Sequence, residues 1–327
     1  MKAIVCPRYG PPEVLELREV KKPIPKKDEI LIKIHATAVI LGDCELRGQN
    51  FPHYGIGMKF LIRLGFGIRG PRKKILGQQC AGEIEAIGED VTLFKLGDQV
   101  FAATEFGLGT YAEYTCMPED GIVSLKPSNM SYEEASTIPI GGTEALHYMN
   151  KAELRQGQKV LINGAGGSIG TIAIQLAKSK GAEVTAVDSA GKYEMLTSIG
   201  ADYFIDYKQE NFHENGERYD VIFDVVGVTH FSDCLNSLDE NGVYLQGNGS
   251  ISRGNKSLAE KHGMKALAGP AKYSTENLTK LRELIESGTV KTIIDRSFSL
   301  DEMVEAHRFV EQGGKKGNVT IAVIASE

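Results

Sequence analysis

The sequence predicts an α/β protein in which a doubly wound parallel sheet is joined to a second, β-rich domain. Between residues 159 and 226, apolar strands such as "KVLIN" and "EVTAV" alternate with helical segments such as "SIGTIAIQLAKSKG". This βαβ order favours a parallel sheet with helices on its faces. Residues 1–123 instead contain short alternating segments broken by turns, which is typical of β structure. A chain of 327 residues also exceeds the usual size of a single core, so two domains are expected.

The elements can be followed in order along the chain. After the N-terminal strands, Ser131 and Glu134 form the pattern of a capping box and predict a helix that is interrupted near Pro139. Gly181 and Gly200 then end two helices of the βαβ region, and "GVYLQGN" and "GMKALAG" continue its strands.

The C-terminal part closes the chain with two helices and a strand. The segment "ENLTKLRELIESG" places four apolar side chains on one helical face: Leu278, Leu281, Leu284 and Ile285. Ser299 and Glu302 predict a second capping box before "MVEAHRFVEQGG". The last strand, "GNVTIAVI", could rejoin the N-terminal β domain.

Composition excludes several classes of function. The formal net charge is -6, which argues against a nucleic-acid partner. The cysteines are scattered and form no C-x-x-C pair, so neither a disulfide framework nor a structural zinc site is suggested: Cys6, Cys44, Cys80, Cys116 and Cys234. The N-terminus lacks an apolar signal core, and no run approaches the roughly 20 apolar residues of a membrane helix. We therefore expect a soluble, cytoplasmic protein with a small-molecule ligand.

A glycine-rich turn, "LINGAGGSIG", links the first strand of the parallel sheet to its helix. The candidate cofactor-binding residues here are Gly164, Gly166, Gly167, Ser168, Ile169 and Gly170. Glycines let the backbone approach a pyrophosphate, and the free N–H groups at the start of the helix bind its charge. The turn therefore predicts a dinucleotide site. The alternative is a tight strand-to-helix turn without a ligand.

The end of the next strand, "VDSAGK", carries signals for both kinds of dinucleotide. Asp188 would accept a hydrogen bond from the ribose 2′-hydroxyl of NAD. Ser189 and Lys192 could instead hold the 2′-phosphate of NADP, with Tyr207 flanking the adenine or the phosphate. Lys192 could also be only a solvated residue at a helix start. These signals favour NADP and leave NAD possible.

Several strings, taken in order, resemble the medium-chain dehydrogenase/reductase superfamily, and most of all its zinc-independent quinone oxidoreductase branch: "GTYAEY", "IGADYFIDY" and "DVVG". The resemblance implies a GroES-like catalytic domain, residues 1–124 and 287–327, interrupted by a Rossmann dinucleotide-binding domain, residues 125–286. It also implies that Thr143 lies near the nicotinamide carboxamide and that Gly227 and Asn248 border the ribose and nicotinamide.

The same resemblance argues against zinc. The zinc ligands of the superfamily's alcohol dehydrogenases correspond to Ile40, Gln78 and Ile140, and none of these is a useful zinc ligand. What remains is hydride transfer from a nicotinamide to an acceptor that needs no metal, such as a quinone or an α,β-unsaturated carbonyl. The rival interpretations are a metal-free NAD(P)-dependent alcohol dehydrogenase and a non-catalytic NADPH-binding protein.

Candidates for the substrate pocket are few, and the sequence names no catalytic acid. Asp43 occupies a position that the branch usually fills with aspartate, but a buried structural hydrogen bond would explain it equally well. Tyr54 could donate to a carbonyl or be an ordinary loop residue. Ile40 and Gln79 depart from the branch, which often has asparagine and aspartate there.

A basic, apolar segment, residues 58–74, interrupts the acidic chain. It contains six basic residues, and no acidic residue lies between Leu46 and Gly82. Three interpretations are open: a lid over the active site, a membrane-surface amphipath, or a solvated loop packed by its own leucines and phenylalanines.

For the assembly we expect a homodimer that pairs through an edge strand, with "GVYLQGN" as the candidate.

Overall fold

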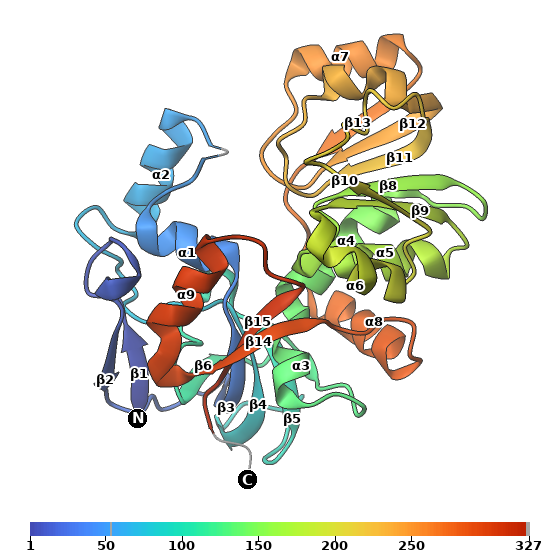
Figure 1. Ribbon diagram of the computed structural model, residues 1–327. Helices are drawn as coiled ribbons and strands as arrows, with labels where there is room; N and C mark the ends of the chain where they lie inside the picture. Colours follow the sequence, from blue (N-terminus) through green and yellow to red (C-terminus); the bar gives the residue numbers. More distant parts are fainter. Residues whose placement is uncertain (53, 325–327) are drawn as a thin grey trace. The chain divides into compact units, whose positions relative to one another are not determined.

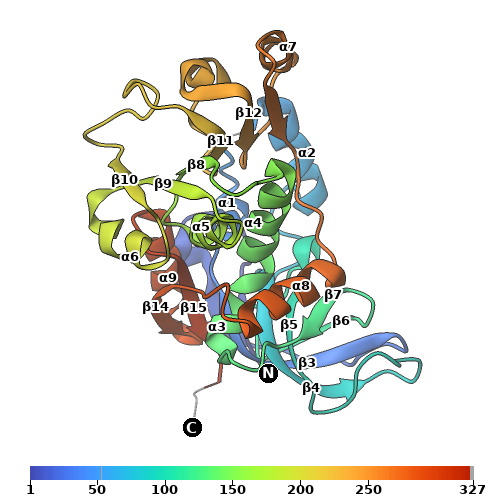
Figure 2. The ribbon, with the colours of Figure 1, turned by 90° about the vertical axis from the view of Figure 1, so that its right-hand side faces the viewer.

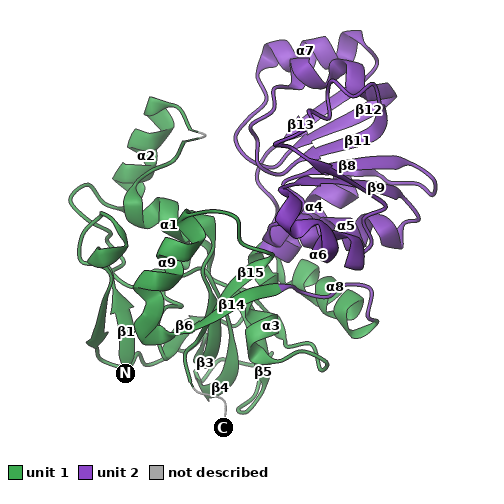
Figure 3. Ribbon diagram, in the orientation of Figure 1, with its two compact units in different colours: residues 1–140, 273–287, 294–327 green, residues 141–272, 288–293 purple. Residues whose placement is uncertain are grey.

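The computed structural model describes residues 1–52 and 54–324, which form two compact units. Unit 1 comprises Met1–Ile140, Tyr273–Ser287 and Ile294–Glu327 (Figure 3). Unit 2 comprises Gly141–Lys272 and Gly288–Ile293 (Figure 3). Both are built from strands and helices, so the α/β fold class predicted from the sequence is confirmed (Figure 1).

Unit 1 is organised around a mainly antiparallel sheet in the order β14-β15-β3-β4-β5-β7, with β6 also paired to β3. The strands are β3 (Glu29–Ala38), β4 (Gln79–Ile87), β5 (Gln99–Ala103), β6 (Tyr114–Pro118), β7 (Ile122–Leu125), β14 (Ile294–Ser299) and β15 (Asn318–Ala322). Ile321 of β15 lies opposite Thr37 of β3. The terminal strand therefore rejoins the N-terminal sheet, as the sequence suggested.

The rest of unit 1 packs around this sheet. Its other elements are β1 (Lys2–Val5), β2 (Glu16–Glu19), α1 (Leu41–Gly48), α2 (Ile56–Phe66), α3 (Tyr132–Ser136), α8 (Thr275–Glu286) and α9 (Met303–Glu311). Short 3-10 turns cover Pro12–Val14, Glu105–Gly107 and Leu300–Glu302. Helices α1 and α9 contact each other (Figure 1), and Met303, Ala306 and Val310 bury the inner face of α9 in one apolar core.

The predicted helix interruption near Pro139 is confirmed. Ser131 caps α3 and accepts a hydrogen bond from the Glu134 N–H at 3.1 Å, while the Glu134 carboxylate accepts from the Ser131 N–H at 2.9 Å. Helix α3 ends before Thr137, and α4 (Ile138–Ala152) begins directly after it, with Pro139 in its first turn. Proline is tolerated there because the first N–H groups of a helix have no intrahelical partner.

Unit 2 contains a six-stranded parallel sheet in the order β10-β9-β8-β11-β12-β13. The strands are β8 (Lys159–Asn163), β9 (Glu183–Asp188), β10 (Tyr203–Asp206), β11 (Tyr219–Asp224), β12 (Leu238–Gln246) and β13 (Lys265–Ala268). The helices are α5 (Ser168–Ser179), α6 (Tyr193–Ser198) and α7 (Arg253–Lys261), with 3-10 turns at Ala190–Lys192 and Phe231–Ser237. Helix α5 packs on β8 and β9 (Figure 2). This is the strand order of a Rossmann fold.

The predicted dimer strand is corrected by this topology. The segment "GVYLQGN" forms part of β12, which pairs with β11 on one side and with β13 on the other. A strand paired on both sides cannot extend a sheet into a second copy. The sheet edge next to it is β13, so pairing of two copies through an edge at this end would have to use β13.

The basic segment forms helix α2 and the loop that follows it. No residue of α2 is buried. For residues 56–66, the interpretation as a loop packed by its own leucines and phenylalanines is wrong, because this part is helical and Ile62 and Phe66 pack against the apolar core of unit 1. Among the described residues, no helix has the length and apolar character needed to cross a membrane.

The capping box of α3 gives a stability prediction. In Ser131→Ala, the Glu134 N–H loses its acceptor, so the free energy of unfolding should fall by about 1 kcal/mol in urea denaturation. Ser198→Ala removes an exposed helical hydroxyl that accepts from no backbone N–H in the described structure. This control should change stability by less than about 0.5 kcal/mol. Equal effects of the two substitutions would contradict the capping role.

Candidate functional site

The glycine turn of unit 2 has a steric reason for each of its crowded glycines. Gly164 has φ +82°, and a Cβ on it would lie 2.5 Å from Val226 Cγ2. A Cβ on Gly170 would lie 2.5 Å from the Ala165 carbonyl oxygen, so α5 packs directly against the turn. At Gly167, in contrast, the nearest atom to an added Cβ is the Gly164 oxygen at 3.7 Å. The backbone is thus tightly folded beneath the turn and accessible at Gly167.

The start of helix α5 is suited to bind an anion. Gly167 is its N-cap residue and, as a glycine, supplies no side chain to cap the helix. The first N–H groups of a helix lack intrahelical partners and carry partial positive charge. The predicted residues Ser168, Ile169 and Gly170 form this first turn. The arrangement fits the pyrophosphate of a dinucleotide.

Asp188, the last residue of β9, connects the turn to the next loop. Its Oδ2 accepts a hydrogen bond from the Gly166 N–H at 2.8 Å, and its Oδ1 accepts from the Ser189 N–H at 2.8 Å. Lys192 forms an ion pair with the same Oδ1 at 2.9 Å. Both side chains are about nine-tenths buried. The structure therefore brings the two opposing cofactor signals, Asp188 and Lys192, together in one pair.

Lys192 also lies over the glycine turn. A Cβ on Gly166 would stand 2.3 Å from Lys192 Cδ and 2.8 Å from Asp188 Oδ2. The interpretation of Lys192 as a merely solvated residue is therefore wrong, because its side chain is buried against Gly166 and Asp188. Tyr207 is near as well, since its N–H donates to the Asp188 carbonyl at 3.3 Å and its side chain is exposed.

The remaining predicted cofactor residues divide into a contacting pair and a buried threonine. Gly227 has φ +74°, and a Cβ there would lie 2.6 Å from the Asn248 carbonyl oxygen. These two residues thus touch, beyond the ends of β11 and β12. Thr143 on α4 is fully buried, and its hydroxyl has no hydrogen-bond partner among the described residues.

Asp224, at the end of β11, orders the loop that carries Gly227. Its carboxylate accepts hydrogen bonds from the N–H groups of Gly227 and Thr229, at 2.9 and 3.0 Å. Asn163 and the Tyr244 hydroxyl donate to it as well. Burial raises the pKa of Asp224, and these hydrogen bonds oppose that shift. In the sequence, Asp224 is marked only by its place in "DVVG" at the end of an apolar strand.

In unit 1, Asp43 lies at the centre of a buried polar cluster. Its carboxylate accepts from the Tyr111 hydroxyl at 2.8 Å, from Gln78 Nε2 at 3.1 Å and from the Ile40 N–H at 3.3 Å. Burial raises the pKa of Asp43 to about 6, although these hydrogen bonds favour the charged form. Of the sequence candidates for the substrate pocket, Ile40 and Asp43 are therefore neighbours at the start of α1.

Tyr54 stands apart from this cluster. Its side chain is 41% exposed and packs edge-on against Phe51, with ring centroids 6.4 Å apart. No hydrogen bond connects it to Asp43 within the described part of the chain. The departure at Gln79 has a structural partner: its Oε1 accepts from the Ile140 N–H at 2.9 Å, while its buried Nε2 has no partner among the described residues.

Three more residues belong to the cluster around Asp43, although the sequence did not predict them there. Tyr111 is fully buried and meets His307 edge-on, with ring centroids 5.6 Å apart. Arg47 donates from Nε to His307 Nδ1 at 3.3 Å. Burial, with the Arg47 charge, lowers the pKa of His307 to about 3, so this histidine is neutral at physiological pH. These contacts join residues far apart in sequence, so no local sequence pattern marks them.

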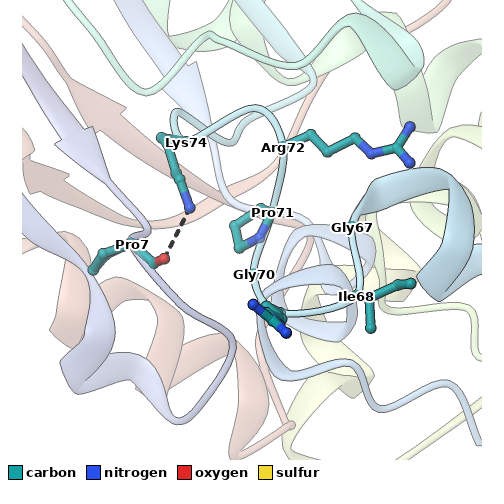
Figure 4. Close-up of a pocket in the computed structure, with 8 residues that line it drawn as sticks. Pro7, Gly67, Ile68, Gly70, Pro71, Arg72 and Lys74 are labelled. Carbon is teal, nitrogen blue, oxygen red and sulfur yellow. Dashed lines mark hydrogen bonds between the residues drawn. The ribbon is translucent and has the colours of Figure 1, made fainter.

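A separate cavity of about 820 Å³ lies beside α2 in unit 1. Its lining consists of Pro7, Gly67, Ile68, Arg69, Gly70, Pro71, Arg72 and Lys74 (Figure 4). None of the predicted site residues contributes to this lining.

Comparison with known proteins places this geometry in a family. The chain is 33% identical to a 2-methylene-furan-3-one reductase of Solanum lycopersicum, over 98% of this chain and 79% of that protein. The chain belongs to the medium-chain dehydrogenase/reductase superfamily.

Two family models, a second relative and a solved structure support the same assignment. Residues 26–127 match the family described as alcohol dehydrogenase GroES-like domain, and residues 199–321 match the family described as zinc-binding dehydrogenase. An NADPH-dependent alkenal/one oxidoreductase of Arabidopsis thaliana, described as chloroplastic, is 30% identical over 98% of this chain and 79% of its own length. The solved structure of the quinone oxidoreductase from Coxiella burnetii has a TM-score of 0.86 and 30% identity, covering 99% of each chain.

The family matched by residues 199–321 is described as a zinc-binding dehydrogenase. The side chains at the three positions that correspond to zinc ligands show whether this chain could bind zinc at the same place. The side chains of Ile40 and Ile140 carry no atom that could bind a metal, and Gln78 donates its side-chain amide N–H to Asp43. Among the described residues, no group of three or more histidine, cysteine, aspartate or glutamate side chains could hold a metal ion. At positions 40, 78 and 140, the side chains do not fit a zinc site.

The buried Asp43 predicts a pH-dependent stability. Because its pKa is higher in the folded protein than the ordinary value of 3.8, the folded state binds the proton more tightly, and stability falls as pH rises from about 4 to about 6. Asp43→Asn lacks this ionisation. Its free energy of unfolding relative to the wild type should therefore rise by about 2 kcal/mol between pH 4 and pH 7 in urea denaturation.

Asp90→Asn, which alters an exposed carboxylate, is the matched control. It should show no such change with pH. A pH-independent difference between Asp43→Asn and the wild type would contradict the buried ionisation.

Proposed function

We propose that this protein is an NADPH-dependent oxidoreductase that transfers hydride to a quinone or an α,β-unsaturated carbonyl without zinc. The observation that carries the proposal is the arrangement of the Asp188–Lys192 pair over Gly166, beside the glycine N-cap of α5. The printed names of relatives support it, since they include an NADPH-dependent alkenal/one oxidoreductase and a quinone oxidoreductase.

The hydrogen bonds of Asp188 favour NADP over NAD. The acid of an NAD-binding Rossmann domain turns its carboxylate to the ribose 2′-hydroxyl. Here the carboxylate already accepts from Gly166 and Ser189 and pairs with Lys192. Its charge is thereby compensated, and in this proposal the Ser189 hydroxyl and the Lys192 ammonium would bind a 2′-phosphate. Tyr207, exposed beside Asp188, would flank the adenine.

The other cofactor residues have matching roles in this proposal. The first turn of α5 would bind the pyrophosphate through its N–H groups. The buried Thr143 hydroxyl, which has no hydrogen-bond partner within residues 1–52 and 54–324, is suited to the nicotinamide carboxamide, which offers both a donor and an acceptor. Gly227 and Asn248 would border the ribose, and Asp224 fixes the loop that presents them.

The absence of zinc ligands at positions 40, 78 and 140 limits which acceptors the protein could reduce. The nicotinamide, when bound, supplies the hydride. The donor set offers no zinc site to polarise a carbonyl, which favours acceptors that are already electron-poor. Ile40 and Asp43 shape unit 1 at the start of α1, where Asp43 holds Tyr111 and Gln78 in place. Asp43 thus acts as a positioning residue in this proposal.

The direct test is oxidation of NADPH by the purified, chelator-treated protein, followed by absorbance with 1,4-benzoquinone and with a 2-alkenal. Saturable oxidation with either acceptor is expected. Tight NADPH binding without turnover on either acceptor would instead favour a non-catalytic NADPH-binding protein. Activity that disappears on chelation and returns with zinc would overturn the metal-free proposal.

A lysine substitution tests the choice of cofactor. In Lys192→Ala, the 2′-phosphate loses a cation and faces the uncompensated Asp188 carboxylate, so NADPH affinity should fall by about tenfold or more. NADH affinity should change less than about threefold, because NADH carries no 2′-phosphate. Nicotinamide fluorescence titration measures both. Lys180→Ala removes the same charge from an exposed site in unit 2 and should leave both affinities unchanged.

A further inference from the structure

Helix α2 has an inner side that fixes it to unit 1. Ile62 and Phe66, four residues apart, pack against the apolar core that includes α1 and α9. The helix ends at Gly67, whose φ of +123° and close approach to the Gly70 carbonyl exclude a side chain. The Tyr9 hydroxyl donates to the Gly67 carbonyl at 2.9 Å. The segment is thus an ordered element held in place by its inner side.

The other side of α2 is an apolar ridge exposed to solvent. Ile56, Phe60 and Leu64 succeed each other at intervals of four residues and therefore share one face of the helix. Their exposed fractions are 89%, 65% and 45%, and the neighbouring Leu61 is 58% exposed. Within unit 1, the helix projects from α1 and the sheet (Figure 1). A continuous row of large exposed apolar side chains marks an interaction surface rather than ordinary surface composition.

Cations flank this apolar ridge without acidic partners. Arg63 lies on α2 beside Ile56 by helical spacing, and Arg69 and Arg72 follow the end of the helix. Among the described residues, none of these three arginines forms an ion pair with a carboxylate. No acidic residue occurs between Leu46 and Gly82, although the whole chain has a net charge of -6. The charge of this surface is therefore opposite to that of the protein as a whole.

The cavity after α2 concentrates the positive charge. Arg69, Arg72 and Lys74 contribute to its lining. The Lys74 ammonium donates to the Pro7 carbonyl at 2.9 Å, while the Arg72 side chain extends away from that contact (Figure 4). Arg69 and Arg72 are exposed, so their guanidinium groups are accessible to an oxyanion. Guanidinium groups bind phosphate oxygens through paired, charge-assisted hydrogen bonds.

We propose that α2 and residues 67–74 form a docking surface for an anionic lipid bilayer. The ridge of Ile56, Phe60 and Leu64 enters the interface between headgroups and acyl chains, as the apolar face of an interfacial helix does. Arg63, Arg69 and Arg72 bind the phosphates of the lipid headgroups, and the cavity receives one of them.

Two features favour a membrane over other occupants. A second copy that used the same surface would place its six basic residues against those of the first, which is repulsive. A free phosphate ion would use the arginines but would leave the apolar ridge without a role. The proposal is independent of the proposed oxidoreductase function, because no cofactor or acceptor takes part in it.

The first experiment is cosedimentation of the full chain with phosphatidylcholine vesicles and with vesicles that also contain phosphatidylglycerol. We expect binding to the anionic vesicles only. Arg69→Gln with Arg72→Gln should lower the partition coefficient roughly 30-fold, because each cation near an anionic surface contributes about fivefold. Lys21→Gln with Lys95→Gln removes the same charge elsewhere on unit 1 and should reduce binding far less.

The second experiment tests the apolar ridge. Phe60→Ser with Leu64→Ser should lower binding by about tenfold or more, since the buried apolar area contributes to interfacial binding. Leu93→Ser with Leu96→Ser alters equally exposed leucines of unit 1 and should have little effect. All four side chains are exposed, and an unchanged thermal unfolding midpoint would show that each variant is folded.

Three results would overturn the proposal. The first is absence of binding to anionic vesicles, or equal losses in the control variants. The second is binding of inorganic phosphate alone that depends on Arg69 and Arg72 while vesicles do not bind, which would identify a free-phosphate site. The third is concentration-dependent self-association that Phe60→Ser with Leu64→Ser abolishes, which would identify a second copy as the occupant.

Discussion

The geometry of the candidate cofactor site in unit 2 depends on the hydrogen bonds and the ion pair of the Asp188 carboxylate. It ties the end of β9 to the glycine turn through the Gly166 N–H and fixes the following loop through the Ser189 N–H and Lys192. A buried carboxylate is costly unless donors surround it. One of these donors comes from the glycine turn and two from the loop after β9, so the carboxylate links the two segments beside the start of α5.

Two other buried aspartates also hold neighbouring groups in place through hydrogen bonds. Asp224 fixes the loop that carries Gly227 by accepting its N–H, and Asp43 gathers Tyr111 and Gln78 at the start of α1. Burial raises the pKa of Asp43 and Asp224, which shows that the surrounding hydrogen bonds offset only part of the desolvation cost. Such groups fix geometry at the expense of stability, a common property of functional sites.

Much of this protein follows from its sequence because the signals are local. The capping boxes at Ser131 and Ser299, and the strand, glycine turn and helix at 159–179, each depend on residues within a few positions of one another. The alternation of strands and helices then restricts the sheet to a parallel, doubly wound arrangement. The superfamily was recognisable for the same reason, since its motifs are short strings in a fixed order.

Tertiary structure alone decided the pairing and exposure of side chains. The sequence left Asp188 and Lys192 as rival signals, and only the folded loop shows them bound to each other. Tyr111 meets Asp43 across distant parts of the chain, and β13, rather than β12, is at the sheet edge. The sequence showed that residues 58–74 are basic and apolar, but which of the apolar side chains are exposed depends on which side of α2 packs against the core. Local rules determine the elements, whereas long-range packing decides which of their groups meet and which remain exposed.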